Sequence, residues 1–246
     1  MAAIRIQHEK VYFNALVDSC NRNEPDKNSS TSNRLFAKND KAAEFEKALA
    51  SHAQKYHSGD VKWRVWSIQS GPDAGGYMVS EGPSSWDILD GRGDINPEHM
   101  ADWAKNVLPL TDGKGKTAYG EFQADLSTVQ LTDYADKIVV SHITTKPGMP
   151  LKVKDLIQRL KKVWDAEKSS IAVYSAVNSG EPGYTIVTRL KAGFKELASD
   201  YRKPITESYN AIHGAGAYDI YLKDFADAVQ SRFSEILIYK PTLSSK

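Results

Sequence analysis

Three polar side chains have the type and setting for proton transfer or for orienting a ligand. His142 lies in the β-branched run Lys137–Thr145, and His213 lies at the end of an apolar helical pattern. An imidazole titrates near pH ~6.5, so either histidine can carry a proton at neutral pH. Both also have a structural alternative, His142 as a hydrogen-bonded strand residue and His213 as a partner of the last helix carbonyls. Asn14 is the third candidate, because a polar side chain inside a strand needs a partner if it is buried.

Five aromatic side chains are candidates for stacking on a planar ligand: Trp66, Tyr77, Trp103, Tyr174 and Tyr184. Side chains alternate between the two faces of a strand, so Trp66 and Tyr174 share the face opposite Val65 and Val173. An aromatic ring on that face either stacks on a ligand or fills a core between two sheets. The sequence leaves open which face lines a pocket.

Other combinations of reactive residues are incomplete. His52 and His57 do not form the HExxH pattern, so no metal site is expected. Cys20 is the single cysteine, which excludes an intramolecular disulfide and a cysteine-based zinc site. The segment 113–117 ends like a phosphate-binding loop, but Leu110 stands where that loop requires its first glycine, and a flexible turn is predicted instead.

The sequence repeats itself at a nearly constant spacing. The segment 65–67, Val-Trp-Ser, precedes the segment 173–175, Val-Tyr-Ser, by 108 positions, and Leu49 precedes Ile157 by the same interval. Near the end of the repeat the interval shortens to 107, which pairs Leu126 with Phe233. A spacing held over about 100 residues predicts two copies of one structural unit.

The second unit, residues 135–246, predicts the order strand, helix, strand, strand, helical segments, strand. Pro150 suits the first turn of a helix, and apolar residues then recur at helical spacing as far as Trp164. The hairpin is predicted at 171–178 and 184–190, and the helical segments at about 194–212 and 217–231. The closing strand is predicted at 233–240.

The first unit, residues 1–134, is predicted in the same order. Its strands are expected at 11–18, 62–69, 76–80 and 126–133, with a helix begun by Asn39 or Asp40 and ending near His57. Residues 84–125 are expected to be helical and loop. The segment 19–38 is rich in Asn and Ser and has no counterpart in the second unit, so it is predicted as an inserted, mobile surface loop.

Composition restricts the partners of the chain. The 246 residues carry a formal net charge of +1, which gives no electrostatic reason to expect nucleic acid or an anionic membrane. No run of about 18 apolar residues is present to span a bilayer, and the first ten residues lack the apolar core of a signal peptide. A cytoplasmic protein is expected, although a secreted protein without its leader would look the same.

A βαββαβ unit is the ferredoxin-like arrangement, an antiparallel sheet with helices on one face. Two such sheets can cover each other, which predicts an α+β protein with a barrel-like core. The strand 65–71, its partner 173–180 and the strand–Lys146-Pro147-Gly148–helix start resemble the dimeric α/β-barrel superfamily. That group includes antibiotic-biosynthesis-type monooxygenases, NIPSNAP-like proteins and haem-handling relatives. Its single-repeat members close the barrel by dimerising, so this tandem chain is expected as a monomer or a homodimer.

The resemblance implies a small apolar or aromatic ligand. Its oxygenases use a strand Asn, a helical Trp and a helical His, and Asn14 and Trp103 match two of these residues. No His follows Trp103, and the second unit offers Ser141, Tyr201 and His213 instead. A cofactor-free monooxygenase or isomerase is one expectation, and a non-catalytic binding or assembly module is another. A haem protein with His213 as axial ligand is the third, and whether the chain is an enzyme stays open. If a site exists, it is expected in one half only.

Overall fold

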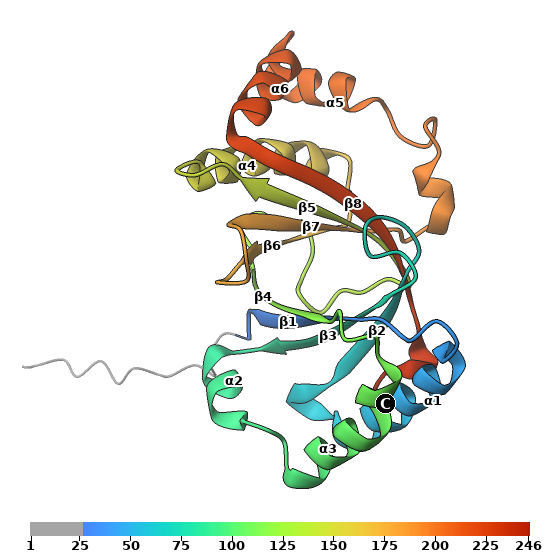
Figure 1. Cartoon of the computed structure of the whole chain (residues 1–246). Helices are drawn as coiled ribbons and strands as arrows, with labels where there is room; N and C mark the ends of the chain where they lie inside the picture. The colour runs from blue at the N-terminus through green and yellow to red at the C-terminus, as the bar shows by residue number, and fades with distance from the viewer. Residues whose placement is uncertain (1–26) are drawn as a thin grey trace, which may run out of the picture.

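The computed structural model describes residues 27–246, and its eight strands form one closed antiparallel barrel (Figure 1). The strand order around the barrel is β1-β3-β2-β8-β5-β7-β6-β4. The strands are β1 (Ser29–Leu35), β2 (Trp63–Ile68), β3 (Tyr77–Ser84), β4 (Lys116–Phe122), β5 (Lys137–Thr145), β6 (Ile171–Ala176), β7 (Gly183–Arg189) and β8 (Val229–Tyr239). Each half supplies four neighbouring strands, and the pairs β2–β8 and β4–β6 join the halves. The predicted α+β fold, two ferredoxin-like sheets closed into one barrel, is confirmed.

Helices cover the outside of the barrel on opposite sides (Figure 1). The first half carries α1 (Ala42–Tyr56), α2 (Trp86–Arg92), α3 (Pro97–Asp102) and a π-helical turn (Trp103–Val107), and the second half carries α4 (Pro150–Ala166), α5 (Ile205–His213) and α6 (Ala217–Ala228). Short 3₁₀ turns lie at Gly59–Val61, Leu108–Leu110, Gly193–Leu197 and Pro241–Leu243. The first helix begins after Lys41, whose side chain makes no capping bond, rather than at Asn39 or Asp40.

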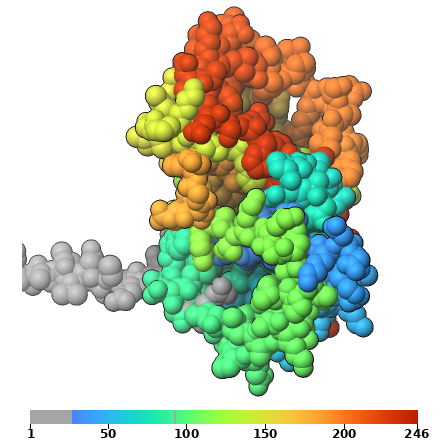
Figure 2. Space-filling view, viewed as in Figure 1, coloured from blue at the N-terminus to red at the C-terminus, as the bar shows by residue number. Residues whose placement is uncertain are grey.

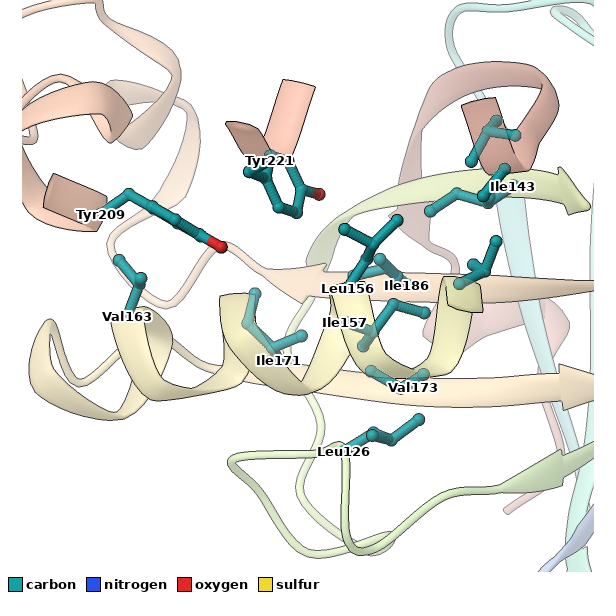
Figure 3. Packing of buried hydrophobic residues seen from close by; sticks show 13 residues of the cluster. Leu126, Ile143, Leu156, Ile157, Val163, Ile171, Val173, Ile186, Tyr209 and Tyr221 are labelled. Carbon is teal, nitrogen blue, oxygen red and sulfur yellow. The ribbon is translucent and has the colours of Figure 1, made fainter. Parts of the chain in front are cut away.

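Alternation along the strands divides the interior into three cores. Val65 packs with the helices of the first half and Val173 with those of the second, where apolar side chains of α4 meet the sheet (Figure 3). Trp66 points the other way, into the barrel, where it packs with Ile68 and Leu237. The strand face that carries Trp66 therefore points into the barrel, and the face that carries Val65 points to the helices.

The predicted mobile loop at 19–38 is wrong for the part that the structure describes. Residues 29–35 form β1, which pairs with β3 and β4 and completes the barrel. Asn and Ser are uncommon in strands, but the backbone of β1 is hydrogen-bonded to β3 on one edge and to β4 on the other. The interval of 108 places β1 opposite β5, so that Arg34 corresponds to His142. The strand predicted at 11–18 lies outside the described residues.

The closing strand predicted at residues 126–133 of the first half is also wrong. β4 begins at Lys116, inside the segment expected to be a flexible turn, whereas residues 126–133 contain turns and no strand. In the barrel, Phe122 lies against Tyr174 as Tyr239 lies against Trp66, with ring centroids 5.6 and 5.2 Å apart. The closing strands are thus related by an interval of 117, and the pairing of Leu126 with Phe233 is wrong.

Each closing strand is followed by a tail that packs on the other half. Ser127 accepts a hydrogen bond from the buried Val173 amide, and Ser244 accepts one from the buried Val65 amide, both at 2.9 Å. Leu126 is buried in the core of the second half and Leu243 in that of the first. The C-terminus accordingly lies beside α1 (Figure 1). This reciprocal exchange ties the two halves together beyond the strand pairs.

Candidate functional site

A cavity of about 290 Å³ lies between the sheet and the α3 region of the first half. The first half occupies the lower part of the molecule in Figure 2. The cavity is lined by Asn33, Arg34, Leu35, Trp63, Val79, His99, Met100, Trp103, Gly115, Lys116 and Thr117. Most of this lining is apolar, with a few polar groups, which is the usual make-up of a small-molecule site.

Asn33 supplies a polar group from the strand side of the cavity. Its Oδ1 accepts a hydrogen bond of 2.7 Å from the Thr117 hydroxyl on β4. With that oxygen engaged, the remaining capacity of the amide includes two N–H donors. The side chain is therefore oriented by its neighbour and able to donate to an oxygen atom of a ligand.

Trp103 and His99 approach the cavity from the helical side. Asn96 caps α3, accepting a hydrogen bond of 2.8 Å from the His99 amide, and Pro97 occupies the first turn. The chain then widens into a π-helical turn at Trp103, whose ring lies edge-on to Trp63 at 6.1 Å. Single π turns are frequent at functional sites because they re-aim side chains.

Behind His99 lies a cluster of imidazole and indole rings. The Nε2 atoms of His99 and His57 are 3.2 Å apart, and His57 stacks on Trp63 at 3.5 Å. The Trp63 indole N–H donates to Glu81 at 2.8 Å, inside the core. His57 Nδ1 lies 3.0 Å from the Val61 carbonyl, which identifies it as the donor nitrogen.

His52 completes the cluster from α1. Its Nδ1 lies 2.8 Å from a carboxylate oxygen of Asp102. Burial lowers the pKa of His52, although the hydrogen bond to Asp102 opposes this. Burial raises the pKa of Asp102, but hydrogen bonds from His52 and Asn106 outweigh it and hold the pKa below its ordinary value. The pair is consistent with a neutral imidazole beside a carboxylate.

The histidines selected from the sequence lie elsewhere. His142 is in the barrel wall, where its Nε2 is 2.8 Å from Glu235 and its ring stacks on Phe233 at 4.6 Å. His213 ends α5, and its Nε2 donates to the Arg159 carbonyl at 3.0 Å. Neither residue lines the cavity, and Asn14 lies outside the described residues.

Of the five selected aromatic residues, only Trp103 lines the cavity. Trp66 and Tyr174 are inside the barrel, and burial raises the pKa of Tyr174 to about 12. Tyr77 donates to Glu46 at 2.8 Å in the core beneath α1. Tyr184 packs at the edge of the second core. The structure therefore does not bring these five rings together.

His213 does not fit the role of an axial haem ligand. The proposed axial ligand, His213, is committed to the Arg159 carbonyl and stacks on Tyr209 at 4.3 Å. The cavity, at about 290 Å³, is at the small end of ligand pockets and suits a compact aromatic molecule better than a porphyrin.

A barrel closed from two ferredoxin-like sheets, with a cavity between one sheet and its helices, defines the dimeric α/β-barrel fold, here contained in one chain. Solved structures show the same fold across both halves. An anthrone oxidase-like protein is 14% identical over 87% of this chain and 92% of its own, with a TM-score of 0.57. A proposed monooxygenase from Fusobacterium nucleatum is 14% identical over 86% and 91%, with a TM-score of 0.54. A proposed monooxygenase from Lactobacillus acidophilus is 11% identical over 86% and 94%, with a TM-score of 0.51.

No model of a known protein family matches the sequence, and no curated protein does so. Within residues 27–246, none of the helices combines the length and the apolar character that crossing a bilayer requires.

Sequence reasoning missed Asn33 and His99. Asn33 falls in the segment predicted as a loop, and His99 precedes Trp103, whereas the resemblance implies a histidine after the tryptophan. One signal for Asn33 was present, since subtracting 108 from Ser141 gives this position. For His99 the signal was its spacing of four residues before Trp103, which places both on one helix face.

Proposed function

We propose that the first half binds a small aromatic molecule in the cavity and oxidises it with O₂ without an organic cofactor. The observation that supports this is the meeting of a strand asparagine, a helical tryptophan and a helical histidine, Asn33, Trp103 and His99, around one cavity. These are the residue types that the dimeric α/β-barrel oxygenases are expected to use. The similar protein described as anthrone oxidase-like suggests anthrone as the substrate class.

The chemistry requires a substrate with a C–H made acidic by conjugation with a carbonyl group, as the CH₂ of anthrone is through its aromatic rings. His99 accepts the proton, because a neutral imidazole nitrogen is a proton acceptor and this side chain lines the cavity. The Asn33 amide donates to the enolate oxygen that forms, and Trp103 holds the aromatic plane and excludes water. The carbanion then reduces O₂, so that a CH₂ group becomes C=O and the second oxygen atom leaves as water.

The other half provides the natural control for this proposal. Ser141 corresponds to Asn33, and its hydroxyl pairs with Ser234 at 2.7 Å in an exposed position. The proposed chemistry therefore belongs to one half of the barrel.

Anthrone is the probe that tests this function. Tryptophan fluorescence measures its binding, and an oxygen electrode with absorbance of the quinone measures turnover above the rate in buffer, in the presence of EDTA. We expect Asn33→Ser and His99→Gln to lower turnover at least ~10²-fold, the range of a lost proton acceptor or oxyanion donor, whereas Ser141→Ala keeps the full rate. Binding without turnover would assign the protein as a binding module, and no binding would refute the cavity as the site.

A further inference from the structure

Three histidine side chains converge behind the cavity wall, two from α1 and its C-terminal end and one from α3. One ring nitrogen each from His52, His57 and His99 lies within 4.8 Å of the others. His52 and His57 are 1% and 2% exposed, and His99 reaches the cavity surface. The cluster is thus closed on the protein side and borders the cavity through one member.

The ring spacing matches that of three imidazoles around a single ion. With a metal–nitrogen bond of ~2.05 Å and tetrahedral angles, ring centroids are expected about 5 Å apart and ligand nitrogens about 3.3 Å apart. The observed centroid separations are 4.7 Å for His52–His99, 5.1 Å for His57–His99 and 5.4 Å for His52–His57. The Nε2 atoms of His57 and His99 are 3.2 Å apart.

The partners behind two of these rings favour the same assignment. A metal-bound histidine almost always donates its other N–H to a carboxylate or a backbone carbonyl. His52 Nδ1 faces the Asp102 carboxylate at 2.8 Å, and His57 Nδ1 faces the Val61 carbonyl at 3.0 Å. With Nδ1 as the donor, Nε2 is the nitrogen of each ring that carries a lone pair, and Nε2 of His57 lies 3.2 Å from Nε2 of His99.

His52 Nε2 is a buried nitrogen without a hydrogen-bond partner among residues 27–246. An unpaired polar atom in a core destabilises the fold, so a compensating interaction is expected. The fold itself does not require this histidine, because Leu160 occupies the position 108 residues later and packs against the second core. Asp165 stands in the corresponding place to His57.

We propose that His52, His57 and His99 bind one divalent transition-metal ion, with zinc as the preferred occupant and Asp102 as the orienting partner of His52. Three neutral imidazoles suit zinc, copper or nickel rather than magnesium or calcium. Three protein ligands leave a fourth position for water or for a ligand entering from the cavity.

Zinc chloride added to the full-length, EDTA-treated protein tests the site. Isothermal titration is expected to give one zinc per chain, and X-ray absorption is expected to show imidazole ligands. His52→Leu, which introduces the residue of the other half, is expected to weaken zinc binding at least ~100-fold, and Asp102→Asn about 10–100-fold. His142→Ala and His213→Ala serve as matched controls and keep the wild-type affinity.

Two results would overturn the site: no stoichiometric binding by the wild-type protein, or an affinity that His52→Leu leaves unchanged. The cluster would then be a packed group of imidazole and indole rings only. The circular dichroism melting curve of His52→Leu shows whether that variant is folded, and His99→Gln at the cavity surface provides a second test in which the core is intact.

This metal site and the oxygenase proposal fail separately. A zinc-bound His99 cannot accept a proton, so zinc is expected to suppress anthrone turnover, and turnover is measured in EDTA. Zinc binding without turnover would support the metal site alone, and turnover in EDTA without zinc binding would support the oxygenase alone.

Discussion

The two halves of the barrel share a scaffold and differ in the space between sheet and helices. α1 and α4 begin 108 residues apart, as do β2 and β6, and the tails after β4 and β8 make equivalent hydrogen bonds. In the second half, α5 and α6 fill the gap with the rings of Tyr209, Tyr218 and Tyr221. In the first half, the shorter α3 and its π-helical turn leave a cavity and a histidine cluster.

The helices that follow the hairpin differ in length between the halves, which explains why the first half has a cavity. The interval between the halves grows from 108 at β2–β6 to 117 at the tails, so the second half has nine extra residues between β6 and its tail. Those residues belong to the region of α5 and α6, which closes the second core. The strands and first helices close the barrel in both halves, whereas the later helices decide whether a cavity exists.

The largest expected effect tests whether the shared scaffold is equally stable in both halves. Leu49 and Ile157 are equivalent, fully buried residues of α1 and α4. Replacing either with Ala is expected to lower the free energy of unfolding by about 2–5 kcal/mol. Because the tails and strand pairs couple the halves, each variant is expected to unfold in one transition in urea. Two separate transitions would show that the halves are independent.

A smaller loss is expected where the two halves share one charged group. Arg34 and His142 are equivalent positions on β1 and β5, and both bind the carboxylate of Glu235, which is 1% exposed. The corresponding position on β4 is Ala118, so the symmetry is broken here. Glu235→Gln is expected to cost about 3 kcal/mol near neutral pH, because Arg34 keeps its charge in a mostly buried site.

The same pair predicts a dependence on pH. Burial raises the pKa of Glu235, but hydrogen bonds from His142 and Arg34 outweigh it, and the pKa lies below its ordinary value of 4.5. The carboxylate therefore stabilises the fold above that value, and this stabilisation is lost as the pH falls through the lowered pKa. Urea unfolding of both proteins from pH 7 to pH 3 is expected to show the difference between wild type and Glu235→Gln shrinking in acid. A constant difference would argue against the ion pair as its cause.

The exchanged tails give a matched pair of substitutions. Ser127→Ala and Ser244→Ala each leave a buried amide, of Val173 or Val65, without its acceptor. An unsatisfied buried donor costs about 1–3 kcal/mol, and the two losses are expected to agree within ~0.5 kcal/mol. Thermal and urea unfolding measure both. Ser141→Ala, at a hydroxyl exposed on the barrel wall, is the control and is expected to change stability little.

The repeat made the barrel predictable, and the places where prediction failed have physical reasons. β1 was missed because Asn and Ser have low strand propensity, yet its register is set by hydrogen bonds to β3 and β4 on both sides. β4 begins in a Gly-Lys segment that resembles a turn. Strand propensity reflects how well a side chain packs on a half-buried sheet. It does not predict strands such as β1 and β4, which form because closing the barrel requires their backbones to pair.

The candidate site was less accessible to sequence reasoning than the fold. Trp103 lines the cavity, and its ligand-binding role stays a prediction. His52, His57 and His99 are up to 47 positions apart and share no motif. Only the packing of α3 against α1 brings them together. The pairing of His52 with Leu160 was available from the interval of 108 and marked a position where the two copies diverge in chemistry.

The smallest expected effect concerns that divergent position. His52→Leu removes an unpartnered buried nitrogen but leaves Asp102 without its imidazole, so the metal-free protein is expected to change in stability by less than ~1 kcal/mol. The reciprocal Leu160→His places an imidazole against the apolar side chains of the second core, and a loss of about 1–3 kcal/mol is expected. Urea unfolding in EDTA compares the two. If His52→Leu were the more damaging substitution, the histidine would be a structural requirement of the first half, and the comparison with Leu160 would no longer support a site built for a ligand.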